Sequence, residues 1–285
     1  MQIPDYHVHP DYSIDAKGSI RKYATMAAAR GLPEICFTTH LDLDPVRASE
    51  DRWIRDRGEM RSFRTLEWLE HYWEDIDRAQ SEVVGQVLLK HGLEIDYFPG
   101  FESFVRPARE FFPWDFVLVS VHCLEHIAIA GQEESGPYLA NHSPEETAEA
   151  YLTAVREAIT SGFGQALAHL DYFKRQVSPG FRPRYLAALT PRLPEILELL
   201  QQAGMALEIN TRAIRTYGLG EPFPGRETLA LAARLGISRI TIGSDSHRPE
   251  ELGNCFDEAR QFAREAGFTT VLTYLKGEID GSFPL

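Results

Sequence analysis

The residues best suited to chemistry are two histidines in the first apolar segment of the chain. His7 and His9 stand two residues apart in residues 3–15, which read IPDYHVHPDYSID. Side chains alternate between the faces of a β-strand, so both imidazoles would point to one side and could hold one metal ion. Two ordinary surface histidines would show the same spacing. The pair alone leaves both interpretations open.

Further metal-binding residue types occur at the ends of five other apolar, strand-like segments. In chain order they are His40 in TTH, Glu94 in LEID, His122 in SVH, His169 in ALAH, and Asp245 with His247 in GSDSH. Imidazole and carboxylate are common ligands of zinc and of related transition metals. Such residues at six strand ends favour a metal site over a chance arrangement.

These segments carry a resemblance to a known family. HVHPDYSIDA, CFTTH, GLEID, SVH, AHLD, EIN and GSDSH occur in this order between Asp5 and about Tyr274. The chain thereby resembles the polymerase-and-histidinol-phosphatase (PHP) family, and in particular its histidinol-phosphate phosphatase branch. The resemblance implies a distorted barrel of seven βα units, one fewer than in the eight-unit barrel.

The resemblance also implies a ligand set for three metal ions, in which Glu94 bridges the first two. The first ion would be held by His7, His9, Glu94 and Asp245, the second by Glu94, His122 and His169, and the third by Asp15, His40 and His247. Many family members carry a histidine where this chain has Asp15. Mixed imidazole and carboxylate ligands suit Zn, Fe or Mn, so we expect two or three divalent transition-metal ions.

Metal ions placed close together would hydrolyse a phosphate monoester. They bind its oxygens, lower the pKa of a water molecule and offset charge in the transition state. Asp245 or His247 could protonate the leaving alkoxide. A serine nucleophile is the competing mechanism, but GSDSH lacks the G-x-S-x-G pattern.

Basic residues beyond the strand ends could bind the phosphate oxygens that are not on metal. Arg215 and Lys174 resemble positions where this branch keeps phosphate-binding cations. Their neighbours Arg212 and Arg175 could serve instead, and solvated loop charges would look the same.

We therefore expect a metal-dependent phosphatase, with L-histidinol phosphate as the substrate that the resemblance implies. The alternatives are a PHP phosphoesterase for a nucleotide or another small ester, and a non-catalytic PHP-fold binding module. Asp42 and Asp44, in the loop after His40, could contact the amine of histidinol phosphate, although a solvated acidic loop is equally consistent.

Composition limits the partners and the location. The 285 residues are 44% hydrophobic, long enough for one large domain, and we expect a single domain over residues 1–285. A net charge of −13 argues against a general nucleic-acid surface. Without a signal-peptide pattern or a long apolar run, we expect a cytoplasmic protein that has no membrane partner. The sequence carries no signal for the oligomeric state.

Local patterns predict the elements that would position these residues. Ser19 and Gly31 would cap the first helix, and Ser143, Pro144 and Glu146 form a capping box for another. We expect one helix over residues 63–91, one over 184–202 and one over 249–266. Residues 41–62 read as a loop, either over the site or as a solvated insertion, and a further loop runs through Asn141. Alternating strands and helices indicate a parallel sheet closed into an α/β barrel.

Overall fold

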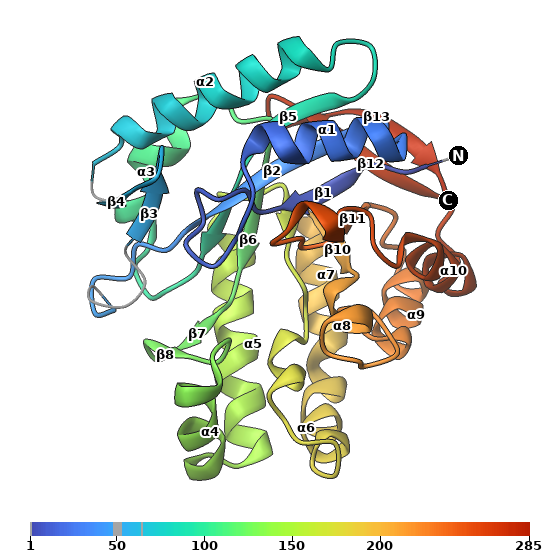
Figure 1. Ribbon diagram of the computed structural model, residues 1–285. Helices are drawn as coiled ribbons and strands as arrows, with labels where there is room; N and C mark the ends of the chain where they lie inside the picture. The colour runs from blue at the N-terminus through green and yellow to red at the C-terminus, as the bar shows by residue number, and fades with distance from the viewer. Residues whose placement is uncertain (1, 48–52, 64) are drawn as a thin grey trace.

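The computed structural model describes residues 2–47, 53–63 and 65–285, and its centre is a parallel sheet of seven strands (Figure 1). Along the sheet the strands are β1 (Asp5–Val8), β2 (Glu34–Leu41), β5 (Leu88–Asp96), β6 (Phe116–Ser120), β9 (Ala166–Leu167), β10 (Ala206–Asn210) and β11 (Ile240–Gly243). Every neighbouring pair is parallel.

The two edges of this sheet meet. Val8 at the end of β1 forms a parallel bridge with Ser246, which follows β11. The backbone N–H of His9 donates to the carbonyl of Ser246 at 2.9 Å. The sheet is therefore a nearly closed seven-stranded barrel, which confirms the fold class expected from the sequence.

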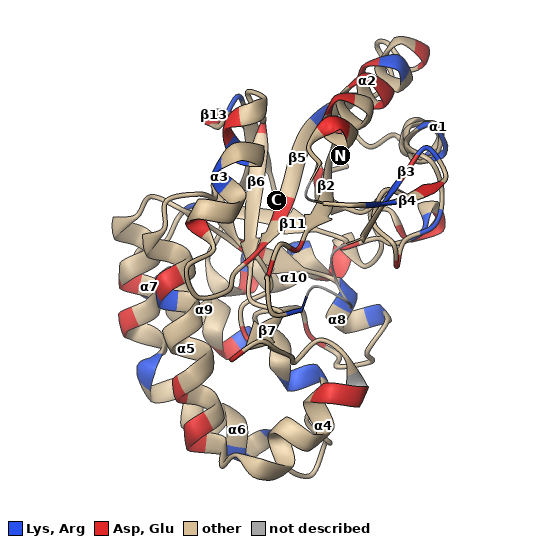
Figure 2. Cartoon of the chain, turned by 90° about the vertical axis from the view of Figure 1, so that its left-hand side faces the viewer, with Lys and Arg blue, Asp and Glu red and all other residues tan. Residues whose placement is uncertain are grey.

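Helices and short turns connect the strands. The longer helices are α1 (Ile20–Arg30), α2 (Glu67–Glu82), α3 (Glu102–Phe111), α4 (Gln132–Asn141), α5 (Pro144–Thr160), α6 (Arg182–Leu189), α7 (Leu193–Gln202), α9 (Arg226–Arg234) and α10 (Phe256–Ala266). The short ones are α8 (Arg212–Arg215) and the 3₁₀ turns η1 (Tyr172–Arg175), η2 (Thr190–Arg192) and η3 (Pro249–Glu251). Figure 2 marks charged positions along α2 and α5, where Asp and Glu outnumber Lys and Arg.

The predicted helix caps are present. The hydroxyl of Ser19 accepts from the N–H of Lys22, and Gly31 ends α1 in the left-handed conformation with φ of 67°. Ser143 and Glu146 form the reciprocal hydrogen bonds of a capping box at the start of α5. These two helices confirm that local cap chemistry is readable from this sequence.

Two predicted helices are divided in the structure. The helix expected over 184–202 is α6, η2 and α7, because Pro191 and Pro194 lack the N–H that a continuous helix would use. The helix expected over 249–266 is η3 followed by α10, with Gly253 at φ of 63° between them. Each break follows from a residue that disfavours the helix interior.

The prediction for residues 63–91 was wrong at its C-terminal end. Helix α2 ends at Glu82, and residues 88–96 form β5, which pairs with β2 through residues 88–95. Val83 and Val87, two apolar residues within the range predicted to be helical, lie in the connection and are buried. Pairing with β2 therefore prevails over the local helical period.

Two segments expected to be loops contain regular structure. Within residues 41–62, β3 (Trp53–Asp56) and β4 (Glu59–Ser62) form an antiparallel hairpin, and residues 48–52 lie outside the described part of the chain. In the segment through Asn141, β7 (Cys123–Leu124) and β8 (Ile127–Ala128) precede α4. Neither segment has the apolar periodicity that would have indicated these elements.

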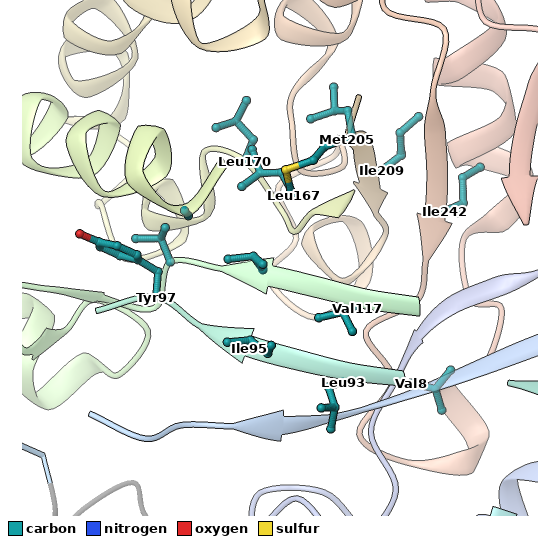
Figure 3. Packing of buried hydrophobic residues seen from close by; sticks show 14 of the residues in the cluster. Val8, Leu93, Ile95, Tyr97, Val117, Leu167, Leu170, Met205, Ile209 and Ile242 are labelled. Atoms are coloured by element: carbon teal, nitrogen blue, oxygen red, sulfur yellow. The ribbon is translucent and has the colours of Figure 1, made fainter. Parts of the chain in front are cut away.

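Apolar side chains pack on both faces of the barrel strands. The larger cluster joins strands to helices and includes Leu93, Val117 and Ile209 (Figure 3). A smaller cluster comes from alternate positions of the same strands and includes Cys36, Phe116 and Ala206. Further along that same face lie His40 of β2 and Glu94 of β5, so strand alternation directs these side chains into the barrel.

The chain ends in an antiparallel hairpin of β12 (Thr270–Leu275) and β13 (Glu278–Pro284). The ring of Tyr274 packs against Tyr6 and Phe116, and its N–H donates to the Tyr6 hydroxyl at 2.8 Å. The hairpin therefore adjoins the smaller core cluster. Among the described residues, no helix is both long enough and apolar enough to cross a membrane.

Candidate active site

The predicted site residues gather at the carboxyl ends of the barrel strands, where barrel enzymes hold their active sites. His40 and Glu94 are register partners in β2 and β5. The others lie in or just beyond strand ends: His7 and His9 at β1, His122 after β6, His169 after β9, and Asp245 and His247 after β11. Asp15 reaches the group from the segment before α1.

The carboxylate of Glu94 lies at the centre of this group. Five imidazole nitrogens lie within 3.5 Å of its oxygens: His40 at 2.9 Å, His169 at 3.0 Å, His7 at 3.3 Å, His9 at 3.4 Å and His122 at 3.5 Å. His40, His7 and His9 face Oε2, whereas His169 and His122 face Oε1. One carboxylate thus presents an oxygen to each of two histidine groups.

Asp245 and Asp15 complete the group on the side of β11. Oδ1 of Asp245 lies 3.4 Å from Nε2 of His9 and 3.4 Å from Nδ1 of His247. Nε2 of His247 lies 2.9 Å from Oδ2 of Asp15, and Nε2 of His40 lies 3.8 Å from that oxygen. All nine residues expected as ligands are therefore brought together.

The donor atoms form overlapping groups in which all atoms lie within 4.8 Å of one another. Four of these groups contain only predicted ligands: His7, His9 and Glu94; His7, His169 and Asp245; His40, Glu94 and His122; and His9, His40 and His247. A fifth group joins His122 to Asp42 and Asp96. The groups share residues, and their members come from all three expected ion sites. The three expected ion sites therefore lie close together.

Electrostatics keep Glu94, Asp245 and His122 in the protonation states that metal ligands require, whereas nearby carboxylates raise the pKa of His7 and of His40 against the effect of burial. Burial would raise the pKa of Glu94, but the imidazoles of His7, His122 and His40 hold it well below its ordinary value. The pKa of Asp245 is likewise held low against burial by His7 and Arg212. Burial lowers the pKa of His122 to about 3, so this imidazole is neutral.

Several buried polar atoms in the group lack a hydrogen-bond partner within the described part of the chain. They are Nε2 of His7, Nε2 of His9, Nδ1 of His40, Nδ1 of His169 and Oε2 of Glu94. Leaving a buried polar atom unsatisfied costs on the order of 1–3 kcal/mol. Nε2 of His7, Nε2 of His9 and Oε2 of Glu94 come from one compact donor group and fit a bound cation, because a cation would satisfy them together.

A cavity of about 370 Å³ opens above the group. Seven of the nine residues line it, whereas His7 and His9 are fully buried beneath. The rings of Tyr172 and Tyr217 form part of its wall, and Trp53 and Phe63 form another part. The site is therefore an open pocket of a size suited to a small molecule.

Three arginines line this cavity: Arg47, which is paired with Glu134, and Arg175 and Arg212. Nη1 of Arg175 donates to the hydroxyls of Tyr172 and Tyr217, and Nε of Arg212 lies 3.1 Å from the Tyr217 hydroxyl. Their aromatic neighbours hold both guanidinium groups at the cavity wall.

Arg215 and Lys174, the cations preferred from the sequence, do not line the cavity. Arg215 is exposed at the end of α8 and borders a separate small pocket. Lys174 is buried, and its Nζ lies 3.0 Å from Asp171 and 3.2 Å from Glu221. The neighbours Arg212 and Arg175, left open as alternatives, occupy the wall instead.

Acidic side chains line a different part of the cavity. Asp42 and Asp96 belong to it, and Asp96 accepts from the backbone N–H of His122 at 2.8 Å. Asp44 does not line the cavity, and its Oδ2 lies 2.6 Å from Nδ1 of His126. The structure thus separates the two acids that the sequence grouped together.

Sequence reasoning missed Asp96 and Glu208. Asp96 stands two residues after Glu94 in LEID, so strand alternation places both on the same face. Glu208 lies in EIN, which carries the resemblance but had no role assigned to it. In both cases the alternation of the strand was the available signal.

The barrel and the buried imidazole–carboxylate group define the class: an α/β-barrel protein with side chains suited to several transition-metal ions in one pocket. Comparison with known proteins gives the family. Residues 5–212 match the PHP domain, and the chain belongs to the PHP family.

Curated relatives match nearly the whole chain. A protein of Deinococcus radiodurans named "Probable histidinol-phosphatase" is 31% identical over 270 residues, covering 94% of this chain and 95% of that protein. The histidinol-phosphatase of Lactococcus lactis is 29% identical over 284 residues, covering 98% and 97%. The crystal structure of the histidinol phosphate phosphatase from Lactococcus lactis, complexed with zinc, L-histidinol and phosphate, superposes with a TM-score of 0.78 at 28% identity, covering 98% of this chain and 100% of that one.

Proposed function

We propose that this chain is a histidinol-phosphatase, which hydrolyses L-histidinol phosphate to L-histidinol and phosphate in histidine biosynthesis. The observation that carries the proposal is the position of Arg175 and Arg212 on the wall of a cavity whose floor is the histidine–carboxylate group. Full-length similarity to histidinol-phosphatases, one of them crystallised with zinc, L-histidinol and phosphate, supports the choice of substrate.

The proposed metal ligands are the nine residues expected from the sequence. His7, His9, Glu94 and Asp245 would hold one ion, Glu94, His122 and His169 a second, and Asp15, His40 and His247 a third. Zn, Fe or Mn suits such ligands. When bound, the ions supply positive charge for the phosphate oxygens and lower the pKa of water, which makes a nucleophile available near neutral pH.

The chain's own residues orient the ester and handle its charge. Arg175 and Arg212 would donate hydrogen bonds to phosphate oxygens that face the cavity wall. A water oxygen then bonds to phosphorus as the bond from phosphorus to the ester oxygen breaks. Asp245 and His247 both line the cavity, but the low pKa of Asp245 leaves it without a proton, so His247 is the candidate donor of the proton that the leaving alkoxide takes up.

The remainder of the substrate carries an ammonium group and an imidazole. The acidic side chains of Asp42 and Asp96 line the cavity, as do the aromatic rings of Trp53 and Phe63. A carboxylate can accept a charge-assisted hydrogen bond from an ammonium group, and an aromatic ring can stack on an imidazole. The cavity therefore supports recognition of both ends of the molecule.

Other expectations stay predictions. Net charge of −13 supports a small phosphate ester over a nucleic acid as the partner. We also keep a cytoplasmic location, the absence of a membrane partner and a single PHP-type domain over residues 1–285 as proposals. The sheet that joins β1 to β11 supports the single domain.

The test is product analysis with metal-replete protein. L-Histidinol phosphate should yield equal amounts of L-histidinol and phosphate, chelation should stop the reaction, and Zn, Mn or Fe should restore it. Activity that persists after the metal has been shown to be gone would exclude the metal-dependent mechanism. A fully metallated protein that releases no phosphate would instead favour a binding module.

A further inference from the structure

Behind the histidine–carboxylate group lies a second buried carboxylate, that of Glu208 in β10. Its side chain is 1% exposed and does not line the cavity. Oε1 lies 2.5 Å from Nδ1 of His7, and Oε2 accepts from the backbone N–H of His169 at 2.7 Å. Glu208 thus contacts two proposed ligands from outside the cavity.

We propose that Glu208 is a positioning residue for the metal ligands. By accepting a hydrogen bond from Nδ1–H of His7, it fixes the ring so that Nε2 faces Glu94 and presents its lone pair there. This inference rests on the proposed function, because it takes His7 to be a metal ligand.

Asn210 extends the same network to a third ligand. Glu208 and Asn210 lie two residues apart on β10 and therefore on one face. Nδ2 of Asn210 donates to Oε2 of Glu208 and to Oδ2 of Asp245, each at 3.2 Å, while its Oδ1 accepts from the N–H of Arg212 at 3.0 Å. His7, His169 and Asp245, one of the compact donor groups, are all tied to Glu208.

The chemistry of the network requires a carboxylate at position 208. Three groups donate to this carboxylate: Nδ1–H of His7, the backbone N–H of His169 and the side-chain amide of Asn210. Both oxygens of Glu208 must therefore accept. In Glu208→Gln, an NH₂ group would replace one oxygen. If the NH₂ group faced His7, Nδ1 of His7 would have to accept a hydrogen bond and Nε2 would carry the proton. If the NH₂ group faced His169 and Asn210, it would meet two N–H donors and could form no hydrogen bond with either.

Gly243 of β11 supplies an independent observation. A Cβ atom at this position would lie 2.4 Å from Cβ of His7 and 2.5 Å from Oε1 of Glu208. Such distances are too short for any side chain, so glycine leaves the space that the His7–Glu208 hydrogen bond needs. The backbone at Gly243 and the side chain of Glu208 therefore both accommodate the His7–Glu208 hydrogen bond.

The test compares zinc affinity between the wild type and Glu208→Gln by competition with a chelator. Loss of a carboxylate that orients a metal-binding histidine weakens metal binding by roughly 10- to 100-fold, and we expect that loss here. Exposed Glu258 provides the matched control, because Glu258→Gln removes the same charge without touching the site. A purely structural role would lower the melting temperature of the metal-free protein but leave the zinc affinity of the folded protein unchanged.

A spectroscopic measurement covers the case in which Glu208→Gln does not fold. In zinc-loaded wild type with nitrogen-15-labelled histidine, we expect a slowly exchanging proton on Nδ1 of His7, assigned by its loss in His7→Asn. Gly243→Ala should shift or remove this signal and weaken zinc binding. Two results would overturn this inference but not the proposed function: a wild-type His7 without a proton on Nδ1, or unchanged zinc affinity in a folded Glu208→Gln. Failure of the wild type to bind zinc would overturn the proposed function as well.

Discussion

Nη1 of Arg212 donates to the backbone carbonyl of Asp245 at 2.6 Å, and it lies 3.6 Å from the Oδ1 of that residue. The guanidinium is thereby held beside a proposed metal ligand while it lines the cavity. A phosphate bound to the metal ions could be contacted by this cation without movement of the backbone.

Arg212→Lys should therefore impair catalysis. A lysine keeps the charge but loses the fixed fork of donors, and a hydrogen bond to a charged group contributes about 1.5–3 kcal/mol. We expect kcat/KM for L-histidinol phosphate to fall by roughly 10- to 100-fold, measured as phosphate release at equal metal content. Arg215→Lys is the matched control, because Arg215 does not line the cavity. Equal losses in both variants would contradict the assignment.

Glu94→Gln should abolish turnover and lower metal content. A neutral amide cannot replace a carboxylate that bridges two cations, whereas the fold should persist because the substitution is isosteric. Circular dichroism, metal analysis and phosphate release on the same preparation would check this, with Glu258→Gln as the control. Near-normal activity in fully metallated Glu94→Gln would show that Glu94 does not bridge.

Asp42 and Asp44 should contribute differently to substrate selectivity. Asp42 lines the cavity, whereas Asp44 contacts His126 and does not. Asp42→Asn should raise the KM for L-histidinol phosphate by about 10-fold, because the ammonium group would lose a charged acceptor. Asp44→Asn should change it little. Hydrolysis of p-nitrophenyl phosphate, which has no ammonium group, should be nearly unaffected by either; equal effects on both esters would remove Asp42 from the account of selectivity.

A buried carboxyl far from the site should make stability depend on pH. Burial raises the pKa of Glu34 to about 7, although a hydrogen bond from Tyr6 and the charge of Lys90 oppose the rise. The folded state therefore holds this proton up to a higher pH than the unfolded state. The stability that Glu34 contributes is present at low pH and is lost between about pH 4.5 and 7.

Glu34→Gln should consequently gain stability relative to the wild type as the pH rises from 5 to 8. The free energy of unfolding of each metal-free protein would be measured in urea. Between pH 5 and 8, the free energy of Glu34→Gln minus that of the wild type should rise by at most roughly 3 kcal/mol. Glu258→Gln, at an exposed position, should give a flat difference. A flat difference for Glu34→Gln too would show that this carboxyl stays ionised in the fold.

The fold and the gathering of the candidate ligands could be predicted because they follow from strand periodicity. His40 and Glu94 end adjacent parallel strands, so their side chains had to meet once the sheet formed. The caps at Ser19 and Ser143 were equally local. Such features depend on a few neighbouring residues and on strand order.

The choice among the basic residues could not be made from sequence. Arg212 and Arg215 lie at opposite ends of the four-residue helix α8, and Lys174 and Arg175 are adjacent in η1. Which member of each pair faces the cavity depends on the direction in which the chain leaves β10 or β9. Arg175 is then held at the cavity wall by the rings of Tyr172, in the same turn, and of Tyr217, which is distant in sequence.

The proposed activity is best tested by kcat/KM for a panel of phosphate monoesters with zinc-loaded and manganese-loaded protein. The panel should contain L-histidinol phosphate, a nucleoside monophosphate, glycerol phosphate and p-nitrophenyl phosphate. Because Arg175, Arg212, Asp42 and Asp96 line the cavity, we expect kcat/KM for L-histidinol phosphate to exceed that for every other ester by at least about 100-fold. A nucleotide or another ester that equals or exceeds it, or no hydrolysis of any ester by fully metallated protein, would contradict the account.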